Sequence, residues 1–319
     1  MSDLTQQSQP PQAVLDQVIG HYNQGELEQT VSLAESLAGQ YPNTLLLYDI
    51  LGAAYMGLND TDKTIASYQK ALQLNPNHTD AYNNMGMALY DQGRFDEAVE
   101  SYQKAVSLEP DFADAHYNLA NALKQKGDLR KAIDSYRASL TINPKDAEVL
   151  LNYGNVLKAY GDFGQAIRVY AQAMKINPTS KAAKTNMDNA VEVKAEIDKD
   201  IADYARIAKL EIGSAEIASF TGTLLKARGY LDAAIDSYRQ VIKINPDNAE
   251  AYYNMGVVLQ EKGEPDAAIN SYKHAIKIKP DFANAHLNMG NAQKHNGDLD
   301  AALENYNKAI NIKPDNADA

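Results

Sequence analysis

The sequence predicts an all-α solenoid of about nine helix-turn-helix units, and the first reason is a proline that recurs every 34 residues. The period skips one position, Ile212, and then resumes in the same phase. A fixed period of this length is typical of stacked helix pairs in which each unit packs only against its neighbours. A repeat array is therefore expected in place of a single globular core. The prolines are Pro42, Pro76, Pro110, Pro144, Pro178, Pro246, Pro280 and Pro314.

Tyrosine, alanine and glycine keep the same period. From the second unit on, a tyrosine lies eight residues before each periodic proline, or before Ile212 in the sixth unit. Its place on the apolar face predicts core packing. In six units an alanine precedes this tyrosine by four residues and a glycine precedes it by nine. The tyrosines are Tyr68, Tyr102, Tyr136, Tyr170, Tyr204, Tyr238, Tyr272 and Tyr306; the alanines are Ala98, Ala132, Ala166, Ala234, Ala268 and Ala302; the glycines are Gly93, Gly127, Gly161, Gly229, Gly263 and Gly297.

Each unit is predicted to contain two helices. With Tyr82 taken as position 4 of its unit, positions 4, 7, 8 and 11 are aromatic, apolar or small. At about 100° per residue these positions share one face of a first helix. The glycine at position 15 ends that helix because it adopts a positive φ readily, and the proline ends the second helix. Small residues at positions 8 and 20, such as Gly86 and Ala98, let the two helices approach closely.

This pattern resembles the tetratricopeptide repeat over nine units, from about residue 11 to residue 316. The resemblance implies a right-handed superhelix whose first helices line a concave groove. Within that family, residues 113–127 (ADAHYNLANALKQKG) and 283–297 (ANAHLNMGNAQKHNG) are similar to the repeat region of O-linked N-acetylglucosamine transferases. They are also similar to bacterial proteins that join such repeats to a transferase domain.

The sixth unit, residues 181–214, keeps its length but departs from the pattern. Asp188 and Asp200 replace the small residues at positions 8 and 20. Ala195 replaces the turn glycine, and Ile212 replaces the proline. Two carboxylates buried between packed helices would cost several kcal/mol. We therefore expect this hairpin to open into one continuous helix or a splayed pair.

The expected organisation follows from these repeats. It comprises a disordered N-terminal segment (1–12), repeats one to five (13–180), the atypical sixth repeat as a long helix or hinge (181–214), repeats seven to nine (215–316) and the start of a truncated repeat (317–319). A last helix with no following unit exposes an apolar row, so we expect further chain or a second molecule to cover it. A homodimer through unit six or through the C-terminal end is one expected partnership.

Composition argues against several classes of function. The chain has no cysteine, which excludes disulfides and thiolate chemistry, and its net charge of −12 argues against nucleic acid as a partner. No secretory signal and no apolar stretch long enough to span a bilayer are found, so we expect a cytoplasmic protein with no membrane partner. A phosphate loop, a dinucleotide fingerprint and paired histidines are also missing, so no catalytic residue, cofactor or metal is expected, and no enzyme. His116 and His286 occupy position 4, where packing is the expected role.

The candidate binding residues are asparagines at positions 6 and 9 and tyrosines at position 5 of the first helices. Asparagine costs about half a kcal/mol relative to alanine inside a helix, so its repetition opposes the helix that carries it. A carboxamide offers a donor and an acceptor together, as a peptide backbone does, so a row of them can hold an extended chain. The alternative is that copied units kept an innocuous asparagine. The predicted peptide-binding residues are Asn84, Asn118, Asn121, Asn152, Asn155, Asn186, Asn254, Asn288, Asn291, Tyr117 and Tyr253, beside an acidic wall of Asp80, Asp114, Glu148, Glu216 and Glu250 at position 2.

Three functions remain open from the sequence. The first is a protein–protein interaction module that binds an extended peptide or protein partner in the concave groove. The second is a self-associating structural scaffold. The third is the substrate-recruiting repeat region of a glycosyltransferase-like or other transferase whose catalytic domain lies beyond residue 319. Chaperone-type binding of a C-terminal carboxylate is not expected, because position 5 lacks the lysines and arginines of that clamp.

Overall fold

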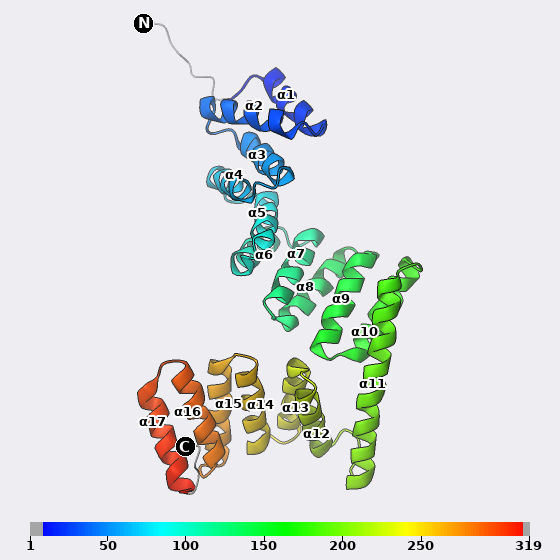
Figure 1. The fold of residues 1–319 in the computed structure, drawn as a ribbon, viewed down its shortest axis with the longest axis vertical. Coiled ribbons are helices and arrows are strands. Elements are labelled where there is room, and N and C mark those ends of the chain that lie inside the picture. Colours follow the sequence, from blue (N-terminus) through cyan, green and yellow to red (C-terminus); the bar gives the residue numbers. More distant parts are fainter. Residues whose placement is uncertain (1–8, 315–319) are drawn as a thin grey trace. The chain divides into compact units, whose positions relative to one another are not determined.

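The computed structural model describes residues 9–314, and every regular element among them is an α-helix (Figure 1). This confirms the all-α solenoid. The helices are α1 (Gln12–Asn23), α2 (Leu27–Gln40), α3 (Leu45–Gly57), α4 (Thr61–Leu74), α5 (Thr79–Asp91), α6 (Phe95–Leu108), α7 (Ala113–Gln125), α8 (Leu129–Ile142), α9 (Ala147–Tyr160), α10 (Phe163–Ile176), α11 (Lys181–Ala208), α12 (Ala215–Ala227), α13 (Leu231–Ile244), α14 (Ala249–Glu261), α15 (Pro265–Ile278), α16 (Ala283–His295) and α17 (Leu299–Ile312).

The first helix begins at Gln12, the last residue of the segment expected to be disordered. Most of that segment, 1–8, lies outside the described residues, and so does the truncated repeat expected at 317–319.

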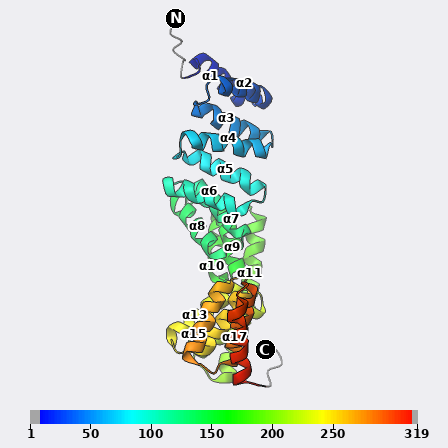
Figure 2. The ribbon, with the colours of Figure 1, turned by 90° about the vertical axis from the view of Figure 1, so that its left-hand side faces the viewer.

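The chain divides into two compact units that meet between Val156 and Leu157, inside α9. The first unit contains α1 to α8 and most of α9, and in Figure 2 the helices α1 to α6 follow one another as stacked layers. The second unit runs from the end of α9 to α17. The blocks 13–180 and 215–316 that the sequence suggests remain a prediction.

The turns inside the helix pairs use left-handed backbone. Gly93 joins α5 to α6 with a φ of 73°, and the corresponding glycines of five later units have φ values between 79° and 98°. Asn59 takes this place between α3 and α4 with a φ of 58°. Asparagine adopts the left-handed region more easily than most residues, since its short side chain can bond locally. The turn is therefore kept where glycine is missing.

The core of each unit is built from the periodic tyrosines. Tyr68, Tyr102, Tyr136, Tyr170, Tyr238 and Tyr272 are at most 2% exposed, whereas Tyr204 and Tyr306 are half-buried. Four of the six, Tyr68, Tyr102, Tyr238 and Tyr272, pack beside a glycine of the first helix. A methyl group added to Gly86 would lie 2.6 Å from Cε1 of Tyr102, and Ala98 is fully buried beside them. The predicted core role of the tyrosine stripe is thus confirmed in these six repeats.

Residues 181–208 form one helix, α11, with no turn near Ala195. The hydroxyl of Ser180 accepts a hydrogen bond from the backbone N–H of Ala183 at its start, and Lys209 ends it with a φ of 54°. No glycine or proline interrupts the helix, so its backbone hydrogen bonds continue where other repeats turn. Its 28 residues span about 42 Å.

Neither aspartate of the sixth unit is buried without a partner. Asp188 is exposed, and the carboxylate of Asp200 accepts from the Arg228 guanidinium at 2.7 Å. The buried residues of α11 are Ala183, Ala190, Ile197 and Ala205, which are spaced by about two turns. Only a narrow stripe of this helix is covered, and Val191 remains 48% exposed.

Candidate peptide-binding site

In the first unit, hydrogen bonds link side chains at positions 5 and 6 of successive first helices. The amide of Asn118 on α7 donates from Nδ2 to Oδ1 of Asn83 on α5 at 3.0 Å. The amide of Asn152 on α9 donates to the Tyr117 hydroxyl at 2.9 Å. Each bond joins position 6 of one repeat to position 5 of the preceding repeat. We call Asn83, Asn118, Tyr117 and Asn152 the amide row.

The second unit contains the same contact. The amide of Asn288 on α16 donates to the Tyr253 hydroxyl on α14 at 3.1 Å. The Tyr253 ring also lies 4.9 Å from the ring of Phe282. The structure therefore brings both predicted tyrosines against a predicted asparagine, and one amide hydrogen of that asparagine is used inside the protein.

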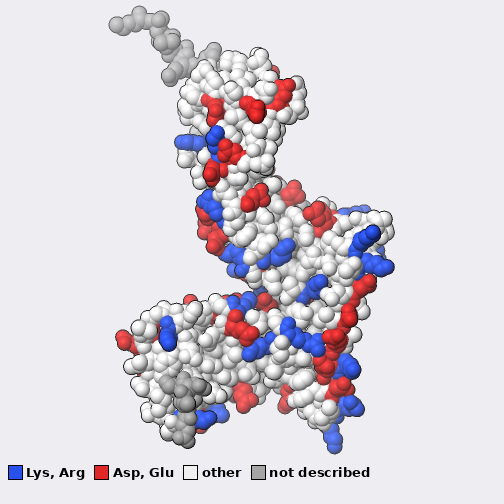
Figure 3. All heavy atoms as spheres, in the orientation of Figure 1, with Lys and Arg blue, Asp and Glu red and all other residues white. Residues whose placement is uncertain are grey.

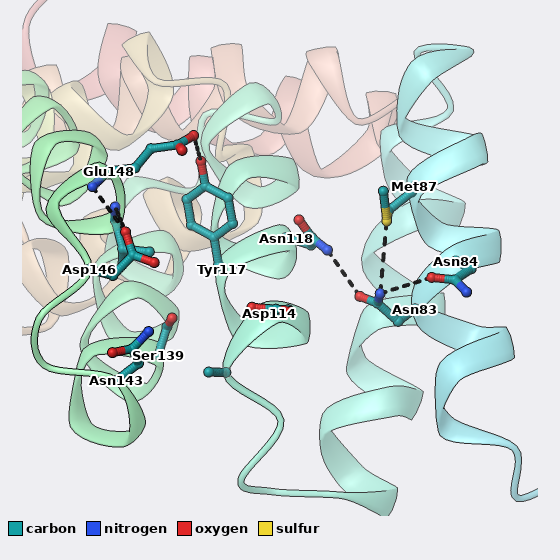
Figure 4. Close-up of a pocket in the computed structure, with 12 residues that line it drawn as sticks. Asn83, Asn84, Met87, Asp114, Tyr117, Asn118, Ser139, Asn143, Asp146 and Glu148 are labelled. Atoms are coloured by element: carbon teal, nitrogen blue, oxygen red, sulfur yellow. Dashed lines mark hydrogen bonds between the residues drawn. The ribbon is translucent and has the colours of Figure 1, made fainter. Parts of the chain in front are cut away.

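Three residues of the amide row, Asn83, Asn118 and Tyr117, border a hollow of 450 Å³ in the first unit (Figure 4). In the close-up the Tyr117 side chain points toward Glu148, and its hydroxyl donates to the Glu148 carboxylate at 2.9 Å. Asn83 is 6% exposed and donates to Asn84 at 3.3 Å. Tyr117, Glu148 and Asn83 of the hollow are thus held in place by hydrogen bonds, two of which join neighbouring repeats.

Burial raises the pKa of the Tyr117 hydroxyl, an effect that Asn121 partly offsets and that Glu148 reinforces. Burial also raises the pKa of Tyr253, against a lowering by Asn288. Both hydroxyls therefore keep their protons at neutral pH. Each can donate one hydrogen bond while it accepts another.

Asparagines at position 9 have a different role, which sequence reasoning missed. The Tyr136 hydroxyl donates to Oδ1 of Asn121 at 2.6 Å, and the Tyr306 hydroxyl donates to Oδ1 of Asn291 at 2.9 Å. Position 9 lies beside the tyrosine of its own second helix, 15 residues later in the chain. These two asparagines accept from the hydroxyls of periodic tyrosines, one buried (Tyr136) and one half-buried (Tyr306).

The remaining predicted residues lie on first helices and are half-buried. Asn84 belongs to α5, Asn155 to α9, Asn186 to α11 and Asn254 to α14. Asn84 borders the hollow with the amide row. The histidines at position 4 behave as expected, since His286 is 5% exposed and bonds Asn305 at 2.9 Å.

A smaller hollow of 290 Å³ lies nearer the N-terminus, beside Asp49 of α3 and Asn84. Oδ2 of Asp49 is 2.9 Å from Nε2 of His78, while its Oδ1 is buried and has no hydrogen-bond partner. Burial raises the pKa of Asp49, and the contact with His78 lowers it. The polar face of the first helices therefore continues to position 5 of the second repeat.

Two further polar residues line the large hollow and come from a second helix. Ser139 belongs to α8, and Asn143 directly follows that helix. The sequence held a signal for Ser139, because the same position is alanine in most other repeats. Those alanines are Ala71, Ala105, Ala173, Ala275 and Ala309.

Some charged side chains away from the hollow form ion pairs. Arg94 bonds Glu97 at 2.6 Å, and Arg206 bonds Asp203 at 2.9 Å on α11. Figure 3 shows acidic and basic atoms side by side over α11. Within residues 9–314, the hollow's Asp114, Asp146 and Glu148 contact no lysine or arginine at ion-pair distance. The hollow therefore carries uncompensated negative charge.

Family models match more than half of the chain. Models described as TPR repeat match residues 52–93, 86–127, 222–263 and 261–297, and models described as tetratricopeptide repeat match 113–146, 147–180 and 283–316. The chain belongs to the tetratricopeptide repeat family. Repeats of this family are typically non-enzymatic interaction modules, so membership supports a general role in protein–protein interaction. The matched ranges lie on both sides of α11.

Several solved structures are similar to this tetratricopeptide repeat protein. A crystal structure of MamA is 25% identical, with 63% of this chain and 98% of that chain covered and a TM-score of 0.32. YrrB, described as a TPR protein with an unusual peptide-binding site, is 18% identical over 79% of this chain and 94% of its own, with a TM-score of 0.32. A tetratricopeptide repeat protein from Parabacteroides merdae is 18% identical over 84% and 94%, with a TM-score of 0.41. No curated protein matches the sequence.

Two further properties of residues 9–314 bear on the site. No group of three or more His, Cys, Asp or Glu side chains in this range is placed to hold a metal ion. None of the helices in the same range is both long enough and apolar enough to cross a membrane.

Proposed function

We propose that this tetratricopeptide repeat protein binds an extended peptide or protein segment along the amide row of its first unit. The observation that supports the proposal is the repeat-to-repeat bonding of that row. Asn118 and Asn152 each use one amide hydrogen to reach the preceding repeat. The second amide hydrogen and the carbonyl oxygen of each side chain are then available to a ligand. An extended peptide presents the same pair of groups at every residue.

The bonds within the row also hold the amides in fixed orientations. A binding side chain that is already ordered loses little rotamer freedom when a ligand arrives, which reduces the entropy cost of association. Two of the predicted asparagines, Asn121 and Asn291, are excluded from this role because their oxygens accept from the hydroxyls of Tyr136 and Tyr306. The position 6 asparagines are the ligand-binding ones.

The expected affinity is modest. A neutral hydrogen bond contributes about 0.5 to 1.5 kcal/mol net, and ordering a flexible segment costs about 2 to 5 kcal/mol. Six such bonds contribute at most about 9 kcal/mol, and the remainder of about 4 to 7 kcal/mol corresponds to a dissociation constant in the micromolar to millimolar range. Binding of this strength tolerates many sequences, which suits a module that presents various segments to other proteins.

The test replaces Asn118, Asn152, Asn254 and Asn288 together with alanine. A fluorescent, unstructured Gly/Ser peptide of about 20 residues is titrated with each protein, because it offers backbone groups and few side chains. Alanine favours helix, so the variant is expected to stay folded while its affinity falls at least fivefold. The matched control changes Asn270 and Asn307, two exposed asparagines of second helices, to alanine. Equal affinity of the folded quadruple variant and the wild type would overturn the proposal.

A second candidate function is self-association, through α17 or α11. On α17, Leu299 is 63% exposed, Leu303 is 64% exposed and Ile310 is 38% exposed. Apolar side chains at such spacing on one helix favour contact with another surface. Sedimentation velocity across a hundredfold concentration range tests this function. A dimer that dissociates in the variant L299Q/L303Q supports it, and a concentration-independent monomer rejects it.

A further inference from the structure

We infer that the 450 Å³ hollow of the first unit binds the cationic side chain of a lysine or arginine on the bound segment. The inference rests on the proposed function, because it states which segments that surface selects. Two independent observations within the described residues support it. The first is a set of carboxylates that no lysine or arginine in residues 9–314 neutralises, and the second is a pair of polar side chains, Ser139 and Asn143, that line the hollow without a hydrogen-bond partner in that range.

The carboxylates come from two neighbouring repeats. Asp114 belongs to α7, Asp146 directly precedes α9, and Glu148 lies in the first turn of α9. Oδ1 of Asp146 accepts from the backbone N–H groups of Glu148 and Val149, both at 3.0 Å, which leaves Oδ2 for a ligand. The Tyr117 hydroxyl holds Glu148. The acidic groups are therefore positioned, and within residues 9–314 no lysine or arginine neutralises them.

Ser139 gives the second observation. It is 2% exposed and lines the hollow, yet its hydroxyl makes no hydrogen bond within the described part of the chain. Other buried serines do: Ser101 donates to the carbonyl of Tyr82 at 2.9 Å, and Ser67 and Ser271 donate to carbonyls of their own helices. Within residues 9–314, the fully buried side-chain oxygens without a partner are on Thr44 and Asp49, so the Ser139 hydroxyl keeps some exposure, at the hollow that it lines. A donor on a ligand would supply the missing bond.

Within the described residues, Asn143, like Ser139, lacks a hydrogen bond that its counterparts in other repeats make. Asn75, Asn177 and Asn245 follow the second helices of other repeats, and each accepts from a backbone N–H two residues later at 3.1 to 3.3 Å. Among residues 9–314, Asn143 makes no such bond, and its side chain lines the hollow (Figure 4). Its carbonyl oxygen adds a further acceptor beside Ser139.

These groups suit a cationic side chain. Carboxylate, hydroxyl and amide oxygens are acceptors, and lysine and arginine carry several donors with a positive charge. A phosphate or another anion would be repelled by three carboxylates. A metal ion is disfavoured because the acidic groups are not gathered as ligands within the described range.

The test uses the full chain and three fluorescent 12-residue Gly/Ser peptides that differ only in the central residue, which is arginine, glutamine or glutamate. Fluorescence anisotropy is measured at low salt and at 0.15 M salt. We expect the arginine peptide to bind at least fivefold more tightly than the glutamine peptide, with a preference that falls as salt rises. A lysine peptide should share that preference, and the glutamate peptide should bind most weakly.

Two variants test whether the preference for the arginine peptide arises in the hollow. Ser139→Ala should keep its thermal stability, because alanine occupies this place in other repeats, and should lose at least twofold of the affinity for the arginine peptide. D114N/E148Q should abolish the preference for arginine over glutamine. The control E100Q/D134N makes the same change in net charge at exposed sites of α6 and α8 and should retain it.

The outcomes separate this inference from the proposed function. Equal binding of the arginine and glutamine peptides would overturn the cation site and leave backbone binding intact. The same holds if the control variant loses the preference as much as D114N/E148Q does, since net charge would then explain it. Failure of all peptides to bind would overturn both proposals.

Discussion

The guanidinium of Arg228 donates to the carboxylate of Asp200 at 2.7 Å and thereby joins the C-terminal half of α11 to the end of α12. Arg228 also lies 3.4 Å from Glu196, one turn earlier on α11. In six of the other repeats the place of Asp200 is a buried alanine, and in the first two repeats it is a buried threonine. In the sixth repeat the residue at this place forms an ion pair with the next repeat.

The Arg228–Asp200 pair should contribute weakly to stability. Its side chains are 28% and 42% exposed, so solvent screens the attraction. A double-mutant cycle with Arg228→Ala and Asp200→Ala should give a coupling of about 0.5 to 1 kcal/mol at low salt, which falls as salt is added. Urea unfolding measures it, with Arg206 and Asp203 as the exposed comparison pair. A coupling of zero at low salt would show that the pair is not formed in solution.

Distances across the sixth repeat should show one continuous helix. Spin labels attached at Ala182→Cys and Arg206→Cys are 24 residues apart in α11, so their backbones should be about 36 Å apart. The chain has no cysteine, so labelling is specific. The matched pair Asp80→Cys and Lys104→Cys has the same sequence separation across the α5–α6 turn and should give less than about 20 Å, since packed helices lie about 8 to 10 Å apart. Similar distances in the two pairs would contradict the open repeat.

Gly86→Ala should destabilise the first unit. The new methyl group would lie 2.6 Å from Cε1 of Tyr102, which is too close without movement of a fully buried ring. Overpacking of this kind costs about 1 to 3 kcal/mol, more than the helix propensity that alanine gains. Thermal and urea unfolding provide the measurement. Gly39→Ala in α2 is the control, since no atom lies within 4 Å of its added methyl group, and it should stabilise by up to about 1 kcal/mol.

Stability should fall steeply above pH 10. Burial raises the pKa of five core tyrosines well above the ordinary value of 10.0, so the folded state holds these protons more tightly than the unfolded state does. Their contribution is fully present below pH 10 and is lost as the pH rises, by about 1.4 kcal/mol per pH unit for each tyrosine. The five are Tyr68, Tyr102, Tyr136, Tyr170 and Tyr272.

Urea unfolding at pH 8, 10 and 11 tests this dependence, with tyrosinate absorbance recorded in parallel. Tyr102→Phe should unfold like the wild type at pH 8, because its hydroxyl makes no hydrogen bond within residues 9–314, and should lose less stability at pH 11. Tyrosinate absorbance that rises fully before unfolding would contradict the prediction.

Local sequence was enough to predict the helix pairs. The spacing of Ala98, Tyr102 and Ala105 defines one helical face, and Gly93 supplies a positive φ at the turn. These features act within one unit, and stacking then repeats them along the chain. The sequence also predicted the departure of the sixth repeat, because this segment contains no glycine or proline to favour a turn.

Only the tertiary structure decided which polar atoms of the first helices are available to a ligand. Asn118 and Asn121 are three residues apart, yet the first bonds Asn83 in the preceding repeat and the second bonds Tyr136 in its own second helix. The fold likewise brings Ser139 into the same hollow as Glu148 of the next repeat. Hydrogen-bond partners 15 or 35 residues apart depend on how helices stack, and helical periodicity alone does not encode that stacking.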